Sequence, residues 1–221
     1  MAKSQILKDI ANGTVSLEVS LKRALLIASD LKNEKMVEWI KNELYGYPTG
    51  VEVPKYRIIS GYFKISYVSG YQKISNQPVG ATILPDSLQD YANYKCRDGI
   101  NSIEDASLSK EQLIIPYVDL IPYLKKQSSL ISVLDFYMEL STIGFKSIYS
   151  SISRELMDML LKIDAEFGNL DDLDISPSNE QMKEINNYIN IKIDSFTNIG
   201  NDNEIKDSSI AGGEITKNGK R

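Results

Sequence analysis

The chain has 221 residues, of which 42% are hydrophobic, so it can bury a core as one domain or as one domain with a tail. It carries 25 Lys and Arg against 30 Asp and Glu, and this net charge of -5 argues against a dedicated nucleic-acid binder. The absence of histidine excludes Ser-His and Cys-His nucleophiles and histidine-based zinc sites.

A single cysteine, Cys96, excludes an intrachain disulfide framework and fits a reducing cytoplasm. The N-terminal sequence MAKSQILKDIANG is too polar for a signal peptide. No apolar run approaches the roughly 20 residues that a membrane span requires. We therefore expect a cytoplasmic protein with no membrane partner, in which only carboxylate, Lys or Tyr side chains remain for acid–base chemistry.

Three helices are predicted near the N-terminus. The first covers residues 4–11 and ends at Gly13, which can adopt the left-handed conformation without strain. The second covers residues 17–31, where apolar residues recur at three- and four-residue steps after the N-cap Ser16. The third follows the N-cap Asn33. The short loops between them favour close, antiparallel packing.

The stretch over residues 34–57 leads from this third helix into the first predicted strand. It contains the only tryptophan, Trp39, and a helix end at Gly46, after which Pro48 blocks any continuation. Two interpretations of its aromatic residues stay open. Trp39 and Tyr47 either pin the helix to its neighbours or form a platform on which a ligand stacks.

The same stretch follows a joined pattern, W-x3-EL-x-GYP and then P-x-YR, with further matching residues in the second helix. The residues that carry the pattern are Leu21, Arg23, Ala24, Leu31, Trp39, Glu43, Leu44, Gly46, Tyr47, Pro48, Pro54, Tyr56 and Arg57. In this pattern the chain resembles the N-terminal domain of the AbiTii family, which is named for an abortive-infection system by which bacteria resist phage. The resemblance covers about residues 1–168. It implies a role in phage defence and carries over no catalytic residue.

Extended and helical patterns alternate in the middle of the chain. Residues 56–68 predict one or two strands bent at Gly61, followed by a turn at Gly70. Residues 88–106 keep a roughly helical spacing, which places Cys96 in the core rather than at a reactive surface.

Three more elements are predicted before Gly168. Residues 113–124 contain two prolines and predict an irregular or edge segment, and residues 130–140 predict a strand that returns to the sheet. The clearest apolar stripe of the chain predicts a long helix over residues 146–167, which Gly168 ends.

Residues 169–221 are predicted to form a linker, a short helix and a polar tail, apart from an α+β domain over residues 1–168. The acidic residues in 169–177 lack the central Gly and final Glu of an EF-hand loop, so a solvated linker is favoured over a calcium site. Ser178 and Gln181 form a capping box for a helix that continues to about Tyr188.

Isoleucines recur through the rest of the chain and are candidate assembly residues. They alternate at Ile189, Ile191 and Ile193 and then recur every five or six residues at Ile199, Ile205, Ile210 and Ile215. The alternation predicts a strand. For the later residues, coils of a β-solenoid, strands completed by another chain and a disordered tail all stay open.

Together these elements predict an α+β fold. A three-helix N-terminal unit packs with a small, mainly antiparallel sheet and a long C-terminal helix, and a polar tail follows. The favoured function is that of a non-enzymatic phage-defence protein, which acts by self-assembly or by contact with a phage or host protein. We expect a homo-oligomer and neither a cofactor nor a metal.

Two alternative functions use other residues. A metal-dependent, nuclease-type toxin would use Glu104 with Asp105, or Glu139, although their spacing matches no nuclease pattern. A nucleotide-signal sensor or adaptor would stack a base on tyrosines of the strand region, Tyr62, Tyr67 and Tyr71.

Overall fold

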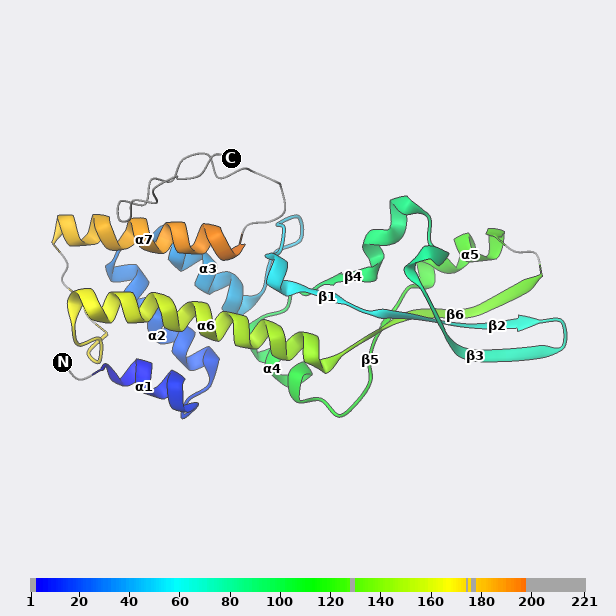
Figure 1. Cartoon of the computed structure of the whole chain (residues 1–221), viewed down its shortest axis with the longest axis horizontal. Coiled ribbons are helices and arrows are strands. Elements are labelled where there is room, and N and C mark those ends of the chain that lie inside the picture. The colour runs from blue at the N-terminus through cyan, green and yellow to red at the C-terminus, as the bar shows by residue number, and fades with distance from the viewer. Residues whose placement is uncertain (1–2, 128–129, 174, 176–177, 198–221) are drawn as a thin grey trace, which may run out of the picture.

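A computed structural model describes residues 3–127, 130–173, 175 and 178–197 of the chain. These residues have the α+β fold that the sequence predicts. Helices form a body at one end of the molecule, and a sheet extends from this body toward the other end (Figure 1). The molecule is therefore elongated, and the two parts meet where the first strands leave the helices.

The three predicted N-terminal helices are present as α1 (Gln5–Asn12), α2 (Leu17–Asp30) and α3 (Glu34–Tyr45). Their predicted caps are confirmed. Ser16 Oγ accepts a hydrogen bond from Val19 N at 3.3 Å, and Asn33 Oδ1 accepts one from Met36 N at 2.9 Å. Gly13 follows α1 with a φ of 63°, as a left-handed C-cap requires.

The other helices of the body are α4 (Ile100–Leu108), α6 (Thr142–Phe167) and α7 (Asn179–Thr197). The predicted long helix is α6, which begins a turn before Lys146. It contacts α1, α2, α4 and α7, and α7 also contacts α3. Buried Leu, Ile and Met side chains from all these helices share one continuous core. Within the described part of the chain, no helix is both long and apolar enough to cross a membrane.

Four antiparallel strands form the main sheet, in the order β3-β2-β6-β5. They are β2 (Tyr62–Ser69), β3 (Gln72–Val79), β5 (Leu113–Pro116) and β6 (Ile131–Leu140). A short helix, α5 (Ile121–Gln127), precedes β6. We call this sheet together with α5 the arm. Its strands confirm the extended segments predicted over residues 56–68 and 130–140. The irregular or edge segment predicted over residues 113–124 contains the edge strand β5, and its last residues begin α5, which was not predicted.

A two-stranded ladder links the body to the arm. It pairs β1 (Ile58–Ser60) with β4 (Asn93–Lys95), and the 3-10 helix η1 (Lys55–Arg57) precedes β1. The predicted bend at Gly61 separates β1 from β2. A Cβ atom on Gly61 would lie 2.1 Å from Met138 Sδ and 3.0 Å from the backbone oxygen of Glu139, so any other residue here would have to displace the buried Met138 side chain.

The two faces of the arm sheet differ. Phe63 of β2 and Phe136 of β6 point to a buried face, where their rings stack at 5.1 Å and Tyr117 packs against both. Residues of opposite parity, such as Tyr62 and Ile114, point to the other face and are exposed. This alternation is typical of an antiparallel sheet with one wet side.

The helix predicted over residues 88–106 is wrong in its first half. A 3-10 helix, η3 (Asp86–Ala92), is followed by β4, and α4 starts only after its N-cap Gly99. The apolar spacing was compatible with a helix, but pairing with β1 uses the backbone of residues 93–95 instead. Cys96 is buried, as expected of a core residue. Two other 3-10 turns, η2 (Ala81–Ile83) and η4 (Val118–Leu120), were not predicted.

The strand predicted at Ile189, Ile191 and Ile193 is also wrong, because all three lie in α7. The helix begins at the predicted capping box, in which Ser178 Oγ accepts a hydrogen bond from Gln181 N at 3.3 Å. It continues well past Tyr188. The four-residue spacing of Ile185, Ile189 and Ile193 places these side chains on the buried face of this helix. The isoleucines Ile199, Ile205, Ile210 and Ile215 lie outside the described residues.

Candidate functional site: the buried Glu43–Arg57 cluster

The sequence motif at the end of α3 folds into one buried polar cluster. Glu43 lies on the last turn of α3, and Arg57 lies at the end of η1. Both side chains are fully buried. Arg57 donates to Glu43 Oε2 from Nη2 at 2.6 Å and from Nε at 3.2 Å. This two-point contact fixes the orientation of the guanidinium as well as neutralising the carboxylate.

Two phenols satisfy the other carboxylate oxygen. Tyr47 and Tyr56 donate to Glu43 Oε1 at 2.6 and 2.7 Å. The indole nitrogen of Trp39 in turn donates to Tyr56 Oη at 3.0 Å, and the Trp39 ring packs edge-on against Phe196 of α7 at 5.5 Å. The tryptophan is therefore held on two sides inside the protein. This packing supports the interpretation that Trp39 and Tyr47 pin α3 to its neighbours.

The remaining donors of Arg57 reach the segment before α4. Its Nη1 donates to the carbonyl oxygens of Asp98 at 2.7 Å and Cys96 at 3.3 Å, and its guanidinium lies 4.7 Å from the centre of the Tyr47 ring. Every charged group of the cluster thus has partners, as a buried ion pair requires. Segments from three separate parts of the chain meet at this one arginine.

Burial and the neighbouring charges shift the pKa values of two phenols, the guanidinium and the nearby thiol of Cys96. Burial and the adjacent Glu43 carboxylate raise the pKa of Tyr47 and of Tyr56 well above the ordinary range of a phenol. Burial opposes the charge of Arg57, but the nearby Glu43 carboxylate outweighs it and raises the pKa of that guanidinium. Burial also raises the pKa of the Cys96 thiol to about 11. Near neutral pH the phenols and the thiol are therefore uncharged.

Glycines permit the close approach of α3 to the segment before α4. A Cβ on Gly46 would lie 2.5 Å from the carbonyl oxygen of Arg97, and one on Gly99 would lie 2.4 Å from that of Leu44. Gly46 also has a φ of 95°. Across the same contact, Tyr47 N donates to the Arg97 oxygen at 2.8 Å. The two backbones touch without any intervening side chain.

Residues 96–99 belong to this site, although their apolar spacing predicts a helix. The Arg97 side chain donates from Nη1 to the carbonyl oxygens of Pro48 at 2.7 Å and Val51 at 2.6 Å, and so holds the loop after α3. Pro54 caps η1, where its carbonyl accepts from Arg57 N at 2.9 Å. The one signal that could have revealed this segment was Gly99, which fits poorly within a helix.

The residues of the buried cluster lie within a stretch of the chain that matches a known protein family. The AbiTii model matches residues 4–189, which include the whole cluster. The chain belongs to the AbiTii family. The match confirms the resemblance seen in the sequence and extends past Gly168 into α7. Neither the curated proteins nor the solved structures gave a match. Membership of this family supports a role in abortive infection, and thus in phage defence.

Some residues of the AbiTii motif lie outside the buried cluster. Leu44 is buried in the core, and Pro48 is exposed on the loop after α3. Arg23 lies apart from the cluster on α2, where its Nη1 donates to Asp9 Oδ2 at 2.6 Å and ties α2 to α1. Hydrogen bonds from Gln5 and Arg23 lower the pKa of the Asp9 carboxyl. Arg23 therefore makes a second, separate link within the helical body.

The residues named for a nuclease lie on different elements. Glu104 and Asp105 are on α4, whereas Glu139 is on β6, where it forms an ion pair with Lys64 of β2. That hydrogen-bonded lysine lowers the pKa of the Glu139 carboxyl. Among the described residues, no group of three or more His, Cys, Asp or Glu side chains is placed to hold a metal ion.

The tyrosines named for a nucleotide sensor do not form one platform. Tyr62 and Tyr67 lie on the same strand with opposite parity, so they point to opposite faces of the sheet. Tyr67 is half-buried and donates to Gln77 Oε1 at 2.9 Å. Tyr71 is fully exposed at the turn between β2 and β3.

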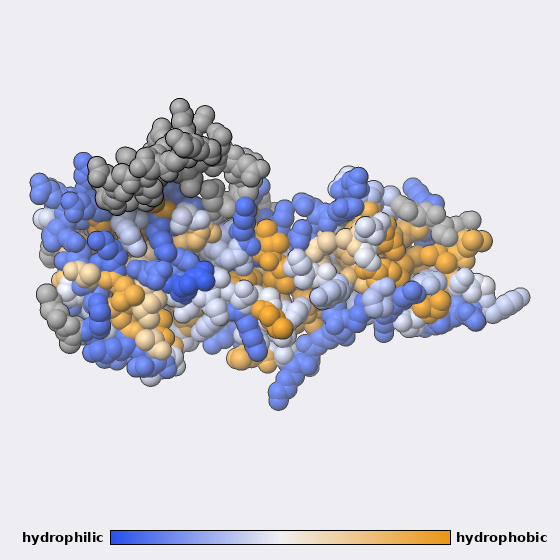
Figure 2. Space-filling view, in the orientation of Figure 1, coloured by the Kyte–Doolittle hydropathy of each residue, from blue (hydrophilic) through white to orange (hydrophobic). Residues whose placement is uncertain are grey.

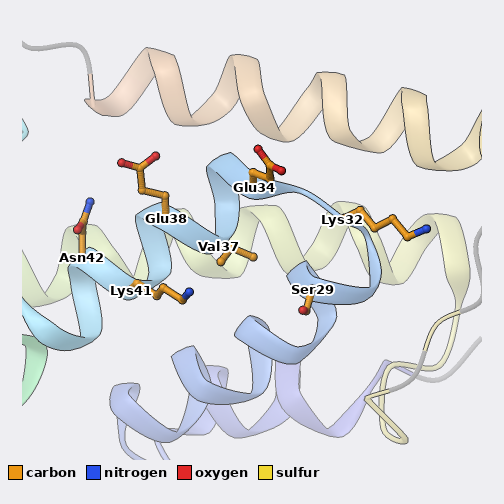
Figure 3. A pocket seen from close by; sticks show the side chains of 7 residues that line it. All are labelled: Ser29, Lys32, Glu34, Val37, Glu38, Lys41 and Asn42. Atoms are coloured by element: carbon orange, nitrogen blue, oxygen red, sulfur yellow. The ribbon is translucent and has the colours of Figure 1, made fainter.

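A surface groove of about 650 Å³ lies on the exposed side of α2 and α3, and none of the cluster residues lines it. Its lining residues are Ser29, Lys32, Glu34, Val37, Glu38, Lys41 and Asn42. Glu34 and Glu38 point toward α7, whereas Ser29 and Val37 lie on the α2 side (Figure 3). The polar groups of this groove therefore diverge, unlike those of the cluster.

Proposed function

We propose that this AbiTii protein acts in phage defence without catalysis, by assembling with other copies of itself through a patch between the body and the arm. We define the junction patch as Tyr62, Leu108, Ile114 and Ile143. The observation that carries the proposal is that one of these four exposed hydrophobic residues, Tyr62, lines a hollow at this junction, and each of the other three lies next to a lining residue in the chain or in the strand register. The buried AbiTii cluster has a supporting role, because it holds the body and the start of the sheet in a fixed relation.

The hollow has a volume of about 510 Å³. It is lined by Tyr62, Ser109, Lys110, Glu111, Gln112, Glu139, Leu140, Ser141 and Thr142. Leu108 and Ile143 each adjoin a lining residue in the chain and are 71% and 73% exposed, and Tyr62 is 72% exposed. Ile114 is opposite the lining residue Glu139 in the β5–β6 register. Hydrophobic surface is visible where the arm meets the body (Figure 2).

A group of exposed hydrophobic residues indicates a surface that contacts another molecule. Single exposed hydrophobic residues are ordinary on a protein surface, but a group around a hollow with a polar lining is typical of an interface. Leu108 and Ile143 come from the ends of two helices, and Tyr62 and Ile114 come from two strands. The patch therefore depends on the fixed relation of body and arm.

The charges of the lining favour a second copy of the same chain as partner. A two-fold interface brings the same patch together twice, so the patch must be complementary to itself. Lys110 and Glu111 are adjacent in the lining and carry opposite charges. Across a two-fold axis, Lys110 of one copy can therefore meet Glu111 of the other.

The edges of the arm sheet are poorly suited to assembly by strand addition. Tyr117 N donates to Phe136 O at 3.0 Å across β5 and β6, so the neighbouring Pro116 has its nitrogen on the outer side. Proline has no N–H with which to bind an incoming strand. At the opposite edge, β3 contains Pro78 and, at Asn76, a φ of 55° next to a register shift. Such edges disfavour further pairing, so assembly would use a face.

Light scattering on the purified full chain tests this proposal. We expect a dimer or larger oligomer for the wild type and a monomer for the double variant Leu108→Glu with Ile143→Glu, because buried, unpaired carboxylates would oppose contact. The matched control is Leu26→Glu with Tyr45→Glu, which adds the same charge at exposed hydrophobic positions on α2 and α3. The control should keep the wild-type mass.

A plaque assay on bacteria that express the same variants connects assembly with defence. We expect the patch variant to lose protection and the control variant to retain it, at equal protein levels. A monomeric wild type, or full protection by a patch variant that is folded and monomeric, would contradict the proposal.

A further inference from the structure

We propose that the free end of the arm docks on the anionic surface of a lipid bilayer. We define the arm tip as Tyr71, Lys73, Lys125, Lys126 and Leu130. This inference is independent of the proposed self-assembly. It departs from the sequence-based expectation of no membrane partner, which rested on the lack of a span, because docking here requires a tip that lies on the surface.

The two segments that form the free end of the arm carry positive charge and no negative charge. Residues 61–85 and 120–134 contain four lysines and neither aspartate nor glutamate, although the whole chain has a net charge of -5. Lys64 is paired with Glu139 near the body. The other three are the lysines of the arm tip. Within the described part of the chain, none of these three forms an ion pair.

The fold brings the arm tip together from two segments. The β2–β3 turn presents Tyr71, and the register places Ser69 opposite both Gln72 and Ile131, so the start of β6 lies beside this turn. Leu130 directly precedes that start. The end of α5, with Lys125 and Lys126, lies at the same free end of the arm (Figure 1).

The hydrophobic residues at the arm tip are exposed to an unusual degree. Tyr71 is fully exposed, and Leu130 is 82% exposed. Both lie at the free end of the arm, where the β2–β3 turn and the start of β6 meet. A flat bilayer surface can accept such a protruding pair, because the apolar side chains enter the headgroup boundary while lysines remain at the interface. A tyrosine suits the same depth, since it combines an apolar ring with a polar hydroxyl.

Lysines at this position match the chemistry of anionic lipids. Each basic residue near an anionic membrane surface contributes to binding, and the effect falls off within a Debye length. Lys125 and Lys126 could serve only to stabilise the C-terminal turn of α5, where positive charge is favourable. That explanation does not apply to Lys73, which lies in a strand. Nucleic-acid phosphates would attract the same lysines, yet they offer no apolar layer for Leu130.

Vesicle co-sedimentation with the full chain tests the inference. We expect binding to vesicles of phosphatidylglycerol and phosphatidylcholine in equal parts, and none to vesicles of phosphatidylcholine alone. The triple variant Lys73→Gln, Lys125→Gln and Lys126→Gln should bind about 100-fold more weakly, at roughly fivefold per lysine. The double variant Tyr71→Ser with Leu130→Ser should also lose most binding. Both variants should keep the wild-type circular dichroism and melting temperature.

The matched control for charge is Lys8→Gln, Lys55→Gln and Lys183→Gln, which removes three exposed lysines outside both the arm tip and the junction patch. It should bind anionic vesicles like the wild type. The inference is overturned if the wild type binds neither kind of vesicle or binds both equally, or if the arm-tip and control variants bind alike. Binding of a short oligonucleotide without any vesicle binding would assign the tip to nucleic acid instead.

Discussion

Arg57 Nη2 lies 2.6 Å from Glu43 Oε2, and both side chains are completely shielded from solvent. The pair connects the last turn of α3 to the residue that directly precedes β1, so it joins the helical body to the start of the sheet. Burial of two charges is tolerated here because phenols and backbone carbonyls satisfy their remaining hydrogen-bonding groups.

Breaking this pair should destabilise the protein strongly. We expect Arg57→Met to lower the free energy of unfolding by about 3–5 kcal/mol, because it leaves the Glu43 carboxylate buried without its counter-charge. Urea denaturation followed by circular dichroism measures the change. The control Arg154→Met removes a guanidinium that is mostly exposed, and should cost less than about 1 kcal/mol. An equal decrease in the free energy of unfolding for the two variants would show that the buried ion pair contributes no more to stability than an exposed one.

The contact between α3 and the segment before α4 should depend on the absence of a side chain at Gly99. We expect Gly99→Ala to cost about 1–3 kcal/mol, because its new Cβ would meet the backbone oxygen of Leu44 at 2.4 Å. The control is Gly80→Ala, whose Cβ would meet nothing closer than Thr82 Oγ1 at 3.4 Å. Thermal melting of both variants compares them. A Gly99→Ala variant as stable as Gly80→Ala would contradict the close approach.

The sequence predicted the elements whose signals are local. Caps at Ser16 and Asn33 and the apolar spacing of α2 and α6 fixed most helices, because each signal lies within a few residues of the element that it defines. Gly61 likewise marked the break between β1 and β2. The α+β fold class followed from these local patterns.

The geometry of the buried cluster could not be predicted in the same way. The motif grouped Glu43 with Arg57, but the carbonyl oxygens of Cys96 and Asp98 come from about 40 residues further along the chain. A backbone acceptor has no sequence signature of its own, since every residue carries one. The apolar spacing around Cys96 even favoured a helix, until pairing between β1 and β4 decided its conformation.

The anchor of the N-terminus should make stability depend on acidic pH. Asp164 near the end of α6 accepts hydrogen bonds from Ser4 N at 3.2 Å and Lys3 Nζ at 3.0 Å. Burial alone would raise the pKa of this carboxyl, but the hydrogen bonds from Ser4 and Lys3 outweigh burial and lower it below its ordinary value of 3.8. The charged form is therefore the one that the fold stabilises. Its contribution is present at pH values above the ordinary pKa and is lost as the pH falls through the lowered one.

We expect Asp164→Asn to lower the free energy of unfolding by about 1–3 kcal/mol at neutral pH, since it weakens charge-assisted hydrogen bonds. The difference from the wild type should shrink as the pH falls below 3.8. Urea denaturation over a series of pH values measures both effects. A difference that stays constant through this range would show that the carboxylate charge is not what holds the N-terminus.

Ile189 and Ile191 distinguish the helix α7 from the strand that their alternation predicted. In a strand the two side chains would share one face and respond alike to truncation. In α7, Ile189 is fully buried and Ile191 is 60% exposed. We therefore expect Ile189→Ala to cost about 2–5 kcal/mol and Ile191→Ala less than about 0.5, measured by urea denaturation of the full chain. Similar costs for both variants would contradict the helix, and a large cost at Ile191 alone would show that another surface covers it.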